Sequence, residues 1–392
     1  MYDIELVREK IDQAVAVLNE LDIDLWLTFC RESACVPDPV MDLIVGQGAC
    51  WLSGYFIARD SDNTVLVGEA DAADFELSGL YRHVRTYSTD VGQELRDIVR
   101  QYAPRRIALN FSESNYAADG LSLGLYRQIE AALAGTPYGQ RLVSAENIVA
   151  RVRGRKSPEE VRRLRQAAEM AASCWDKMIE QLRVGMSEVQ IAARFEEIIV
   201  GLGGTPSFNT IVNAGSKTKP GHSSPTDTIV EPGDLLHVDF GVRCQDYCSD
   251  IQRLIYFRRP EESAPPAELL QAFATVRDIQ HEAIKLYRPG AIGHEIDTLA
   301  RKRLLAAGYP EFNHGLGHQI GRAVHDGGAI VGPLWPRYGN LGTIPLEENN
   351  ALTVEFGITL DGIGHVSLEE DVLVTPQGGL LLCQPQLELV VR

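Results

Sequence analysis

Four strand-like segments in the second half of the chain each carry one acidic residue on the face opposite their apolar residues. We predict these strands over residues 234–242, 249–257, 351–358 and 366–374. Side chains alternate between the two faces of a strand, so Asp239 lies opposite the face formed by Val238 and Phe240. The same alternation sets apart three further acids, which are Asp250, Glu355 and Glu369.

Four carboxylates at such positions restrict the kind of site that this part of the fold can form. A single acid on an amphipathic strand ordinarily faces solvent, but that interpretation accounts less well for four of them on four β-rich strands. Clustered carboxylates removed from water are costly in free energy unless cations accompany them. The pattern therefore favours a metal site.

A glycine-rich segment adds imidazoles to this set. His314, His318 and His325 fall within twelve residues, whereas the whole chain has nine histidines. Two histidines four apart on a helix would indicate zinc, but the glycines at 315, 317 and 321 disfavour a helix, and there is no HExxH motif. Glycine lets the backbone approach a ligand closely, so we interpret the segment as a functional loop.

Four carboxylates and one imidazole form a hard, oxygen-rich ligand set. This set suits Mn²⁺, Co²⁺ or Fe²⁺ better than a structural tetrahedral Zn²⁺. Four carboxylates also balance the charge of two divalent ions, with room for a bridging hydroxide. We therefore expect two divalent metal ions, with Mn²⁺ first and Co²⁺, Fe²⁺ or Zn²⁺ as alternatives.

The first part of the chain alternates strands with helices, which predicts an α/β domain over residues 1–150. The elements expected there are helices over 4–20, 91–102 and 120–133 and strands over 25–29, 64–67 and 106–109. The second part, 151–392, mixes strands with a helix that begins at Pro158 and further helices over about 188–202, 267–288 and 293–307, an α+β pattern. Ser157 and Ser187 each open a capping box, and we expect the basic run 151–156 to be a solvated connector.

Charge and cysteine content restrict the partners and the compartment. With 37 basic and 54 acidic residues the net charge is −17, which argues against nucleic acid or an anionic membrane as a partner. The chain shows neither a signal-peptide pattern nor an apolar run long enough to span a bilayer, so we expect a cytoplasmic location. Among the seven scattered cysteines, Cys244 and Cys248 are expected on one face of a strand, as small buried hydrophobes.

Taken together, these segments resemble the pita-bread metallohydrolase superfamily of methionine aminopeptidases, Xaa-Pro aminopeptidases, prolidases and creatinase. The resemblance covers nearly the whole chain in a two-domain, prolidase-like arrangement, and is weaker in the first half, where residues 51–55 carry it. In the second half the matching segments are 238–241 and 249–253 for the two aspartates, 314–318 and 324–326 for the histidines, 353–355 and 368–371 for the glutamates, and 221–226 for an upstream histidine.

The resemblance implies a fold and a ligand set. The fold would be an α/β creatinase-like domain over 1–150 followed by an α+β pita-bread catalytic domain over 151–392. The ligands of a dinuclear centre would be Asp239, Asp250, His318, Glu355 and Glu369. Asp250 and Glu369 would bridge both metals, while Glu370 would face away.

The resemblance also implies an activity, which is hydrolysis of Xaa-Pro peptide bonds by a metal-bridging hydroxide, as a dipeptidase or an aminopeptidase. Glu355 would carry the proton from the nucleophile to the leaving nitrogen. His222 and His325 would donate hydrogen bonds to the substrate and to the tetrahedral intermediate. A small proline-containing peptide is then the expected substrate, and a homodimer the expected assembly.

Two positions depart from the family pattern and keep alternatives open. Phe356 stands where the family usually has Pro, and Ser367 stands where prolidase-like members often have Arg. Neither change removes a ligand, but both bear on the substrate pocket. One alternative is a creatinase-like hydrolase of small non-peptide amides, although creatinase itself works without metals. The other is a catalytically inactive binding member, although such members typically lose ligands.

Overall fold

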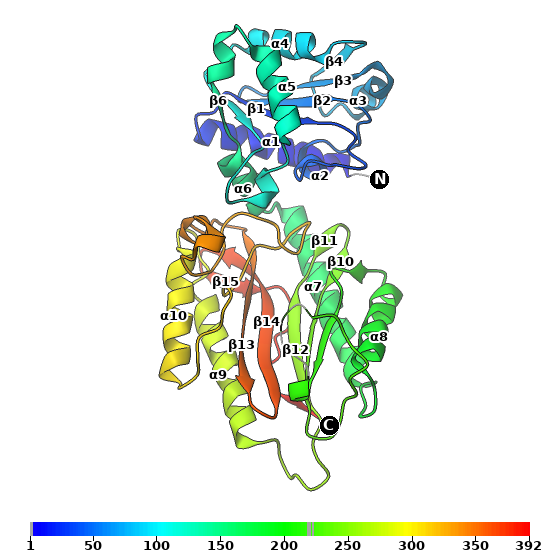
Figure 1. Ribbon diagram of the computed structural model, residues 1–392, viewed down its shortest axis with the longest axis vertical. Helices are drawn as coiled ribbons and strands as arrows, with labels where there is room; N and C mark the ends of the chain where they lie inside the picture. Colours follow the sequence, from blue (N-terminus) through cyan, green and yellow to red (C-terminus); the bar gives the residue numbers. More distant parts are fainter. Residues whose placement is uncertain (1–2, 218–220, 222) are drawn as a thin grey trace. The chain divides into compact units, whose positions relative to one another are not determined.

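The computed structural model describes residues 3–217, 221 and 223–392. The chain folds as two compact units, Met1–Arg153 and Gly154–Arg392, and each is described here by itself (Figure 1). This division falls three residues after the boundary expected at residue 150.

The first unit is a mixed sheet with helices on both faces. Its strands follow the order β4-β3-β2-β1-β5-β6, and β1 runs antiparallel to β2 and parallel to β5. The strands are β1 (Leu25–Cys30), β2 (Ser53–Ala58), β3 (Thr64–Gly68), β4 (His83–Tyr87), β5 (Ile107–Leu109) and β6 (Leu142–Ser144). The helices are α1 (Ile4–Glu20), α2 (Met41–Ile44), α3 (Ala72–Ser78), α4 (Val91–Tyr102), α5 (Leu123–Leu133) and α6 (Glu146–Gly154).

Alternation along the strands produces this layering. Trp26 and Tyr55 belong to an apolar cluster with residues of α1, whereas Leu27 and Phe56 belong to a second cluster with residues of α4 and α5. All four side chains are at most 1% exposed. Burial of apolar surface, at roughly 25 cal/mol per Å², therefore stabilises both faces of the same sheet.

Local sequence signals place several of these elements correctly. The predicted helix over 4–20 is α1, which Asp3 caps. The helix predicted over 120–133 begins later, at Leu123, because the Ser122 hydroxyl caps it there. Strand β2 was not predicted, since it is buried along its whole length and shows no alternation of polar and apolar residues.

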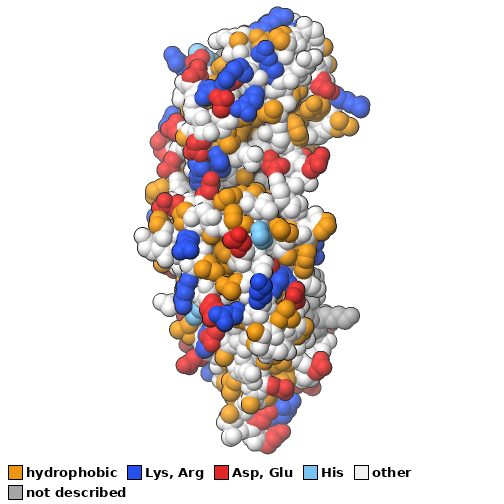
Figure 2. Space-filling model, turned by 90° about the vertical axis from the view of Figure 1, so that its left-hand side faces the viewer, with side chains coloured by type: hydrophobic (Ala, Val, Ile, Leu, Met, Phe, Trp, Pro, Cys, Tyr) orange, Lys and Arg blue, Asp and Glu red, His pale blue; other side chains and the backbone are white. Residues whose placement is uncertain are grey.

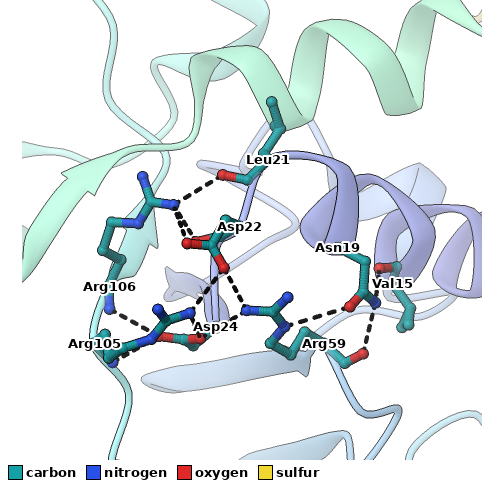
Figure 3. A network of polar contacts seen from close by, with 8 residues as sticks. All are labelled: Val15, Asn19, Leu21, Asp22, Asp24, Arg59, Arg105 and Arg106. Atoms are coloured by element: carbon teal, nitrogen blue, oxygen red, sulfur yellow. Dashed lines mark hydrogen bonds and ion pairs between the residues drawn. The ribbon is translucent and has the colours of Figure 1, made fainter.

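An ion-pair network joins the ends of three strands in the first unit (Figure 3). Asp22 and Asp24 precede β1, Arg59 follows β2, and Arg105 precedes β5. The Arg59 and Arg105 guanidinium groups each lie 2.8 Å from Oδ1 of Asp22, and they lower the pKa of Asp22 to about 2. The network fixes these strand ends relative to one another, although exposed pairs of this kind contribute little stability individually.

The second unit is built on a larger, mostly antiparallel sheet in the order β13-β14-β12-β9-β8, with β15 paired to β14 and β16 to β12. Its strands are β8 (Ile211–Ala214), β9 (Leu235–Phe240), β12 (Ile251–Tyr256), β13 (Ala351–Leu360), β14 (Gly364–Thr375), β15 (Gly378–Leu381) and β16 (Val390–Val391). A small separate sheet contains β7 (Thr205–Pro206), β10 (Val242–Cys244) and β11 (Tyr247–Cys248).

Four helices pack against apolar residues of the larger sheet, and Figure 1 shows them to either side of its strands. They are α7 (Pro158–Ile179), α8 (Glu188–Gly201), α9 (Ala267–Ile284) and α10 (Gly293–Ala306). Val238 and Phe240 of β9 share a cluster with residues of α7 and α8. Val354 and Phe356 of β13 share another with residues of α9 and α10. Both predicted capping boxes are present, and Ser157 caps α7.

The basic run 151–156 is not a solvated connector, so that expectation is wrong. Helix α6 continues to Gly154, and Lys156 is only 2% exposed. Its ammonium group forms an ion pair with Asp326, 2.8 Å from Nζ to Oδ2. Acidic partners distant in sequence neutralise the run and so allow its burial. A local sequence pattern does not reveal such partners.

The strand predicted over 234–242 is also interrupted. It divides at Gly241, where a β-carbon would lie 1.9 Å from the Ser249 carbonyl oxygen, so only glycine permits this close crossing of two segments. Cys244 and Cys248 are buried as predicted, but they lie on two strands of a hairpin, β10 and β11, and not on one. The predicted helix over 267–288 ends at Ile284.

The surface carries both signs of charge. On the face shown in Figure 2, acidic and basic side chains are interspersed over the described residues, consistent with a net charge of −17 built from 54 acids and 37 bases. Within the described part of the chain, no helix combines the length and apolarity needed to span a bilayer.

Candidate metal centre

The pairing of the strands gathers the predicted acids on one face of the larger sheet. Across β12 and β9, Gln252 lies opposite Asp239, and across β12 and β14 it lies opposite Glu369. Glu355 on β13 is in turn opposite Glu369. Asp250 immediately precedes β12 and lies two residues before Gln252, so it follows the same alternation.

The histidine loop brings His318 to this face. Thr353 donates its N–H to the His318 carbonyl oxygen (2.9 Å), which lays the loop along β13. The approach requires glycine, because a β-carbon at Gly317 would lie 2.0 Å from the Thr353 carbonyl oxygen. As a result, Nε2 of His318 lies 3.7 Å from Oδ2 of Asp250 and 3.8 Å from Oε1 of Glu355.

Three of these side chains are already placed to share one ion. The ligand atoms of Asp250, His318 and Glu369 all lie within 4.8 Å of one another. One buried oxygen each of Asp239, Asp250 and Glu369 has no hydrogen-bond partner among the described residues. Unpaired buried carboxylate oxygens are costly, and metal coordination satisfies them. The residues present therefore fit divalent cations.

The pKa values of the four carboxyl groups indicate a site that needs positive charge. Burial raises the pKa of Asp239 to about 7 and, together with the neighbouring Asp239 carboxylate, raises that of Glu355 to about 8. Burial and the surrounding carboxylates hold the pKa values of Asp250 and Glu369 well above their usual range. Without cations these carboxyls therefore hold their protons to higher pH than isolated acids do, because adjacent negative charges disfavour ionisation.

The other residues that the sequence analysis discussed are His325, His222 and Glu370. The His325 ring stands edge-on to the His318 ring at 4.3 Å and is exposed to solvent. His222 lies outside the described residues. Glu370 forms a buried ion pair with Arg253, 2.9 Å from Oε2 to Nη2, so its carboxylate is already neutralised.

Three residues that the sequence analysis did not assign to the site lie next to the acids. Gln252 donates a hydrogen bond from Nε2 to Oε2 of Glu369 (2.8 Å), and its Oε1 faces Nε2 of His237 (2.9 Å). Asp371 accepts the N–H of Asp250 at 3.1 Å. Each missed residue lies two positions from an expected ligand, so period-two alternation could have identified all three as neighbours of the site.

Comparison with known proteins agrees with this arrangement. The sequence matches metallopeptidase family M24 over residues 162–376, which is more than half of the chain. The chain therefore belongs to metallopeptidase family M24. As a member it is a hydrolase that uses divalent metal ions.

Individual relatives extend this result. The chain is similar to a Xaa-Pro dipeptidase from Pyrococcus horikoshii, with 31% identity over 247 residues, which cover 62% of this chain and 67% of that protein. A putative dipeptidase from Bacillus subtilis, YkvY, is 32% identical over 278 residues, 70% of this chain and 71% of that protein.

Solved structures show the same architecture over nearly the full length. An X-Pro aminopeptidase from Thermotoga maritima has a TM-score of 0.73 at 26% identity, covering 97% of this chain and 99% of that one. A Xaa-Pro dipeptidase from Bacillus anthracis has a TM-score of 0.76 at 23% identity, covering 98% and 100%. The predicted fold class, an α/β creatinase-like domain with an α+β pita-bread domain, is confirmed.

Proposed function

We propose that this metallopeptidase hydrolyses Xaa-Pro peptide bonds, with Asp239, Asp250, His318, Glu355 and Glu369 as the ligands of two divalent ions. The observation that carries the proposal is the convergence of four carboxylates and one imidazole on one face of a sheet, with unpartnered oxygens among them. The names of the Pyrococcus and Thermotoga relatives support the substrate class.

The chemistry at this site divides between ions and side chains. Divalent ions bound there acidify a water molecule and polarise the scissile carbonyl. Glu355 is partly exposed, and its Oε1 lies 3.8 Å from Nε2 of His318, so its carboxylate can take a proton from the attacking water. The same carboxyl group then delivers the proton to the leaving proline nitrogen.

His325 supplies the other polar group in the proposed mechanism. Its exposed ring lies beside His318, so an N–H from His325 can reach the substrate carbonyl oxygen and stabilise the charge that develops there. We assign the same kind of role to His222, which precedes the described segment beginning at Ser223.

We further propose Mn²⁺ as the metal, a homodimer as the assembly and the cytoplasm as the location. The hard oxygen ligand set supports Mn²⁺. All seven cysteines carry free thiols, which is typical of proteins in a reducing compartment. Light scattering that gives a mass of one 43.2 kDa chain would contradict the dimer.

One assay tests the activity and separates it from the alternative substrate class. Metal-free and Mn²⁺-loaded protein should be compared on Xaa-Pro dipeptides, longer Xaa-Pro peptides and creatine. We expect metal-dependent cleavage before proline and none of creatine. Glu355→Gln should abolish turnover while the fold persists. Cleavage of creatine alone would favour the non-peptide amide hydrolase, and metal binding without cleavage of any of these substrates would favour an inactive binding member.

A further inference from the structure

The Gln252 side chain lies between the two glutamates of the proposed centre. Its Nε2 is 2.8 Å from Oε2 of Glu369 and 3.4 Å from Oε2 of Glu355. The residue is only 6% exposed. A single neutral amide on strand β12 thus contacts both carboxylates.

The orientation of this amide is fixed by its other contacts. Oε1 of Gln252 accepts a hydrogen bond from the Ser367 hydroxyl (2.5 Å) and faces Nε2 of His237 (2.9 Å). The other ring nitrogen of His237, Nδ1, faces Oδ1 of Asn213 (3.1 Å), so the ring is held between two amide side chains. When the two carboxyl groups are ionised, as metal binding requires, they only accept hydrogen bonds, so the reverse orientation would set the amide oxygen against two acceptors.

The contacts divide the oxygens of each glutamate by role. Oε2 of both Glu355 and Glu369 is turned toward Gln252. Oε1 of Glu355 is turned toward His318 instead, and Oε1 of Glu369 is buried with no hydrogen-bond partner in the described part of the chain. One oxygen of each carboxylate is therefore anchored while the other is presented to the cluster.

We propose that Gln252 is a positioning residue that fixes Glu355 and Glu369 in the orientation in which they bind metal ions. This inference rests on the proposed metal centre. Hydrogen bonds from neighbouring groups commonly orient metal ligands in this way, and their loss typically reduces metal affinity 10–100-fold.

A neutral amide is suited to this task because it adds no charge. Among the described residues, no Lys or Arg forms an ion pair with any of the four acids, which are Asp239, Asp250, Glu355 and Glu369. Divalent ions therefore meet no competing Lys or Arg among the described residues at these carboxyl groups. A cation at position 252 would orient the glutamates equally well but would compete with the metal ions for that charge.

Titration of metal-free protein with Mn²⁺, followed by calorimetry, tests the proposal without an activity assay. In Gln252→Met the amide is replaced by an apolar group of similar size, and we expect Mn²⁺ affinity to fall about 10–100-fold. Ser367→Ala, which removes one contact that orients the amide, should cause a smaller loss and serves if Gln252→Met does not fold.

Gln280, which lies on helix α9, provides a matched control because it contacts the two strands that carry Glu355 and Glu369. It is 2% exposed and donates from Nε2 to the backbone carbonyls of Val354 (3.0 Å) and Leu368 (2.5 Å), beneath the helix-covered face. Gln280→Met should lower the melting temperature but leave Mn²⁺ affinity unchanged. Equal Mn²⁺ affinity in wild type, Gln252→Met and Ser367→Ala would overturn the role of Gln252 alone. A wild-type protein that binds no Mn²⁺ would overturn the proposed centre itself.

Discussion

Lys156 and Asp326 form an ion pair inside the second unit, with Nζ 2.8 Å from Oδ2 and side chains 1% and 3% exposed. The pair connects the residue before the α7 cap with the loop that carries His325. Asp326 also accepts the N–H of Ala323 (3.2 Å), so its carboxylate holds the turn just before that histidine.

Breaking this pair from one side should destabilise the protein strongly. We expect Lys156→Met to lower the free energy of unfolding of the second unit by about 3–5 kcal/mol, since it removes the ammonium group that lies 2.8 Å from the buried Asp326 carboxylate. Replacing both residues, as Lys156→Met with Asp326→Leu, should recover part of that loss. Urea denaturation measures both, and a single-variant cost below about 1 kcal/mol would contradict the structural role.

Glu369 and Glu370 are adjacent in sequence but should respond oppositely to substitution. Glu370→Ala removes the partner of buried Arg253, so we expect a stability loss of about 3–5 kcal/mol with metal stoichiometry retained. Glu369→Ala should abolish binding of at least one ion at little cost to the metal-free fold. Urea denaturation and metal analysis on both variants decide, and identical profiles would show that the assignment of the two glutamates is wrong.

Metal binding should release protons near neutral pH. Because the pKa of Asp239 is raised to about 7 and that of Glu355 to about 8, both carboxyls hold protons in the metal-free protein. Apparent Mn²⁺ affinity should therefore increase as pH rises to about 8 and level off above it. Calorimetry in buffers of different ionisation enthalpy counts the released protons. A pH-independent affinity between 6 and 8 would contradict the prediction.

The metal-free protein should become more stable when one carboxylate is removed. Burial and neighbouring acids raise the pKa of Asp250 in the fold, so ionisation of this group costs stability as pH rises above its unfolded value of about 3.9. We expect the free energy of unfolding of metal-free Asp250→Asn to be higher than that of metal-free wild type at pH 8, because the raised pKa of Asp250 makes its ionisation in the fold costly.

The control for this prediction is pH itself. Near pH 4 the carboxyl of Asp250 is protonated in the fold, so the difference in unfolding free energy between metal-free Asp250→Asn and wild type should nearly vanish. With Mn²⁺ present the order should reverse, because bound metal stabilises only the protein that can hold it. Thermal melts of wild type and Asp250→Asn, each with Mn²⁺ and with a chelator, give the four stabilities to be compared.

Gly317 should tolerate no side chain. A β-carbon there would lie 2.0 Å from the Thr353 carbonyl oxygen, so Gly317→Ala must push the histidine loop away from β13. We expect a loss of about 1–3 kcal/mol and weaker metal binding through displaced His318. Gly315→Ala is the matched control, since its nearest contact is 3.2 Å, and it should have a clearly smaller effect on Mn²⁺ affinity.

Much of the proposed site was accessible from the sequence because strands have a period of two. That period separates Asp239 from Val238 and Phe240, and it separates Glu355 and Glu369 from the residues that pack against the helices. The glycines around His318 likewise indicated a close backbone approach. These are local properties, so the chain displays them without its fold.

Other features depend on residues distant in sequence and were decided only by the tertiary structure. The burial of Lys156 depends on Asp326, which lies 170 positions away. The orientation of Gln252 depends on His237 and Ser367, from two other strands. The sequence by itself determined which faces of the strands are polar, because alternation is local. The fold decided which polar groups meet, because strand pairing and buried charge compensation are long-range.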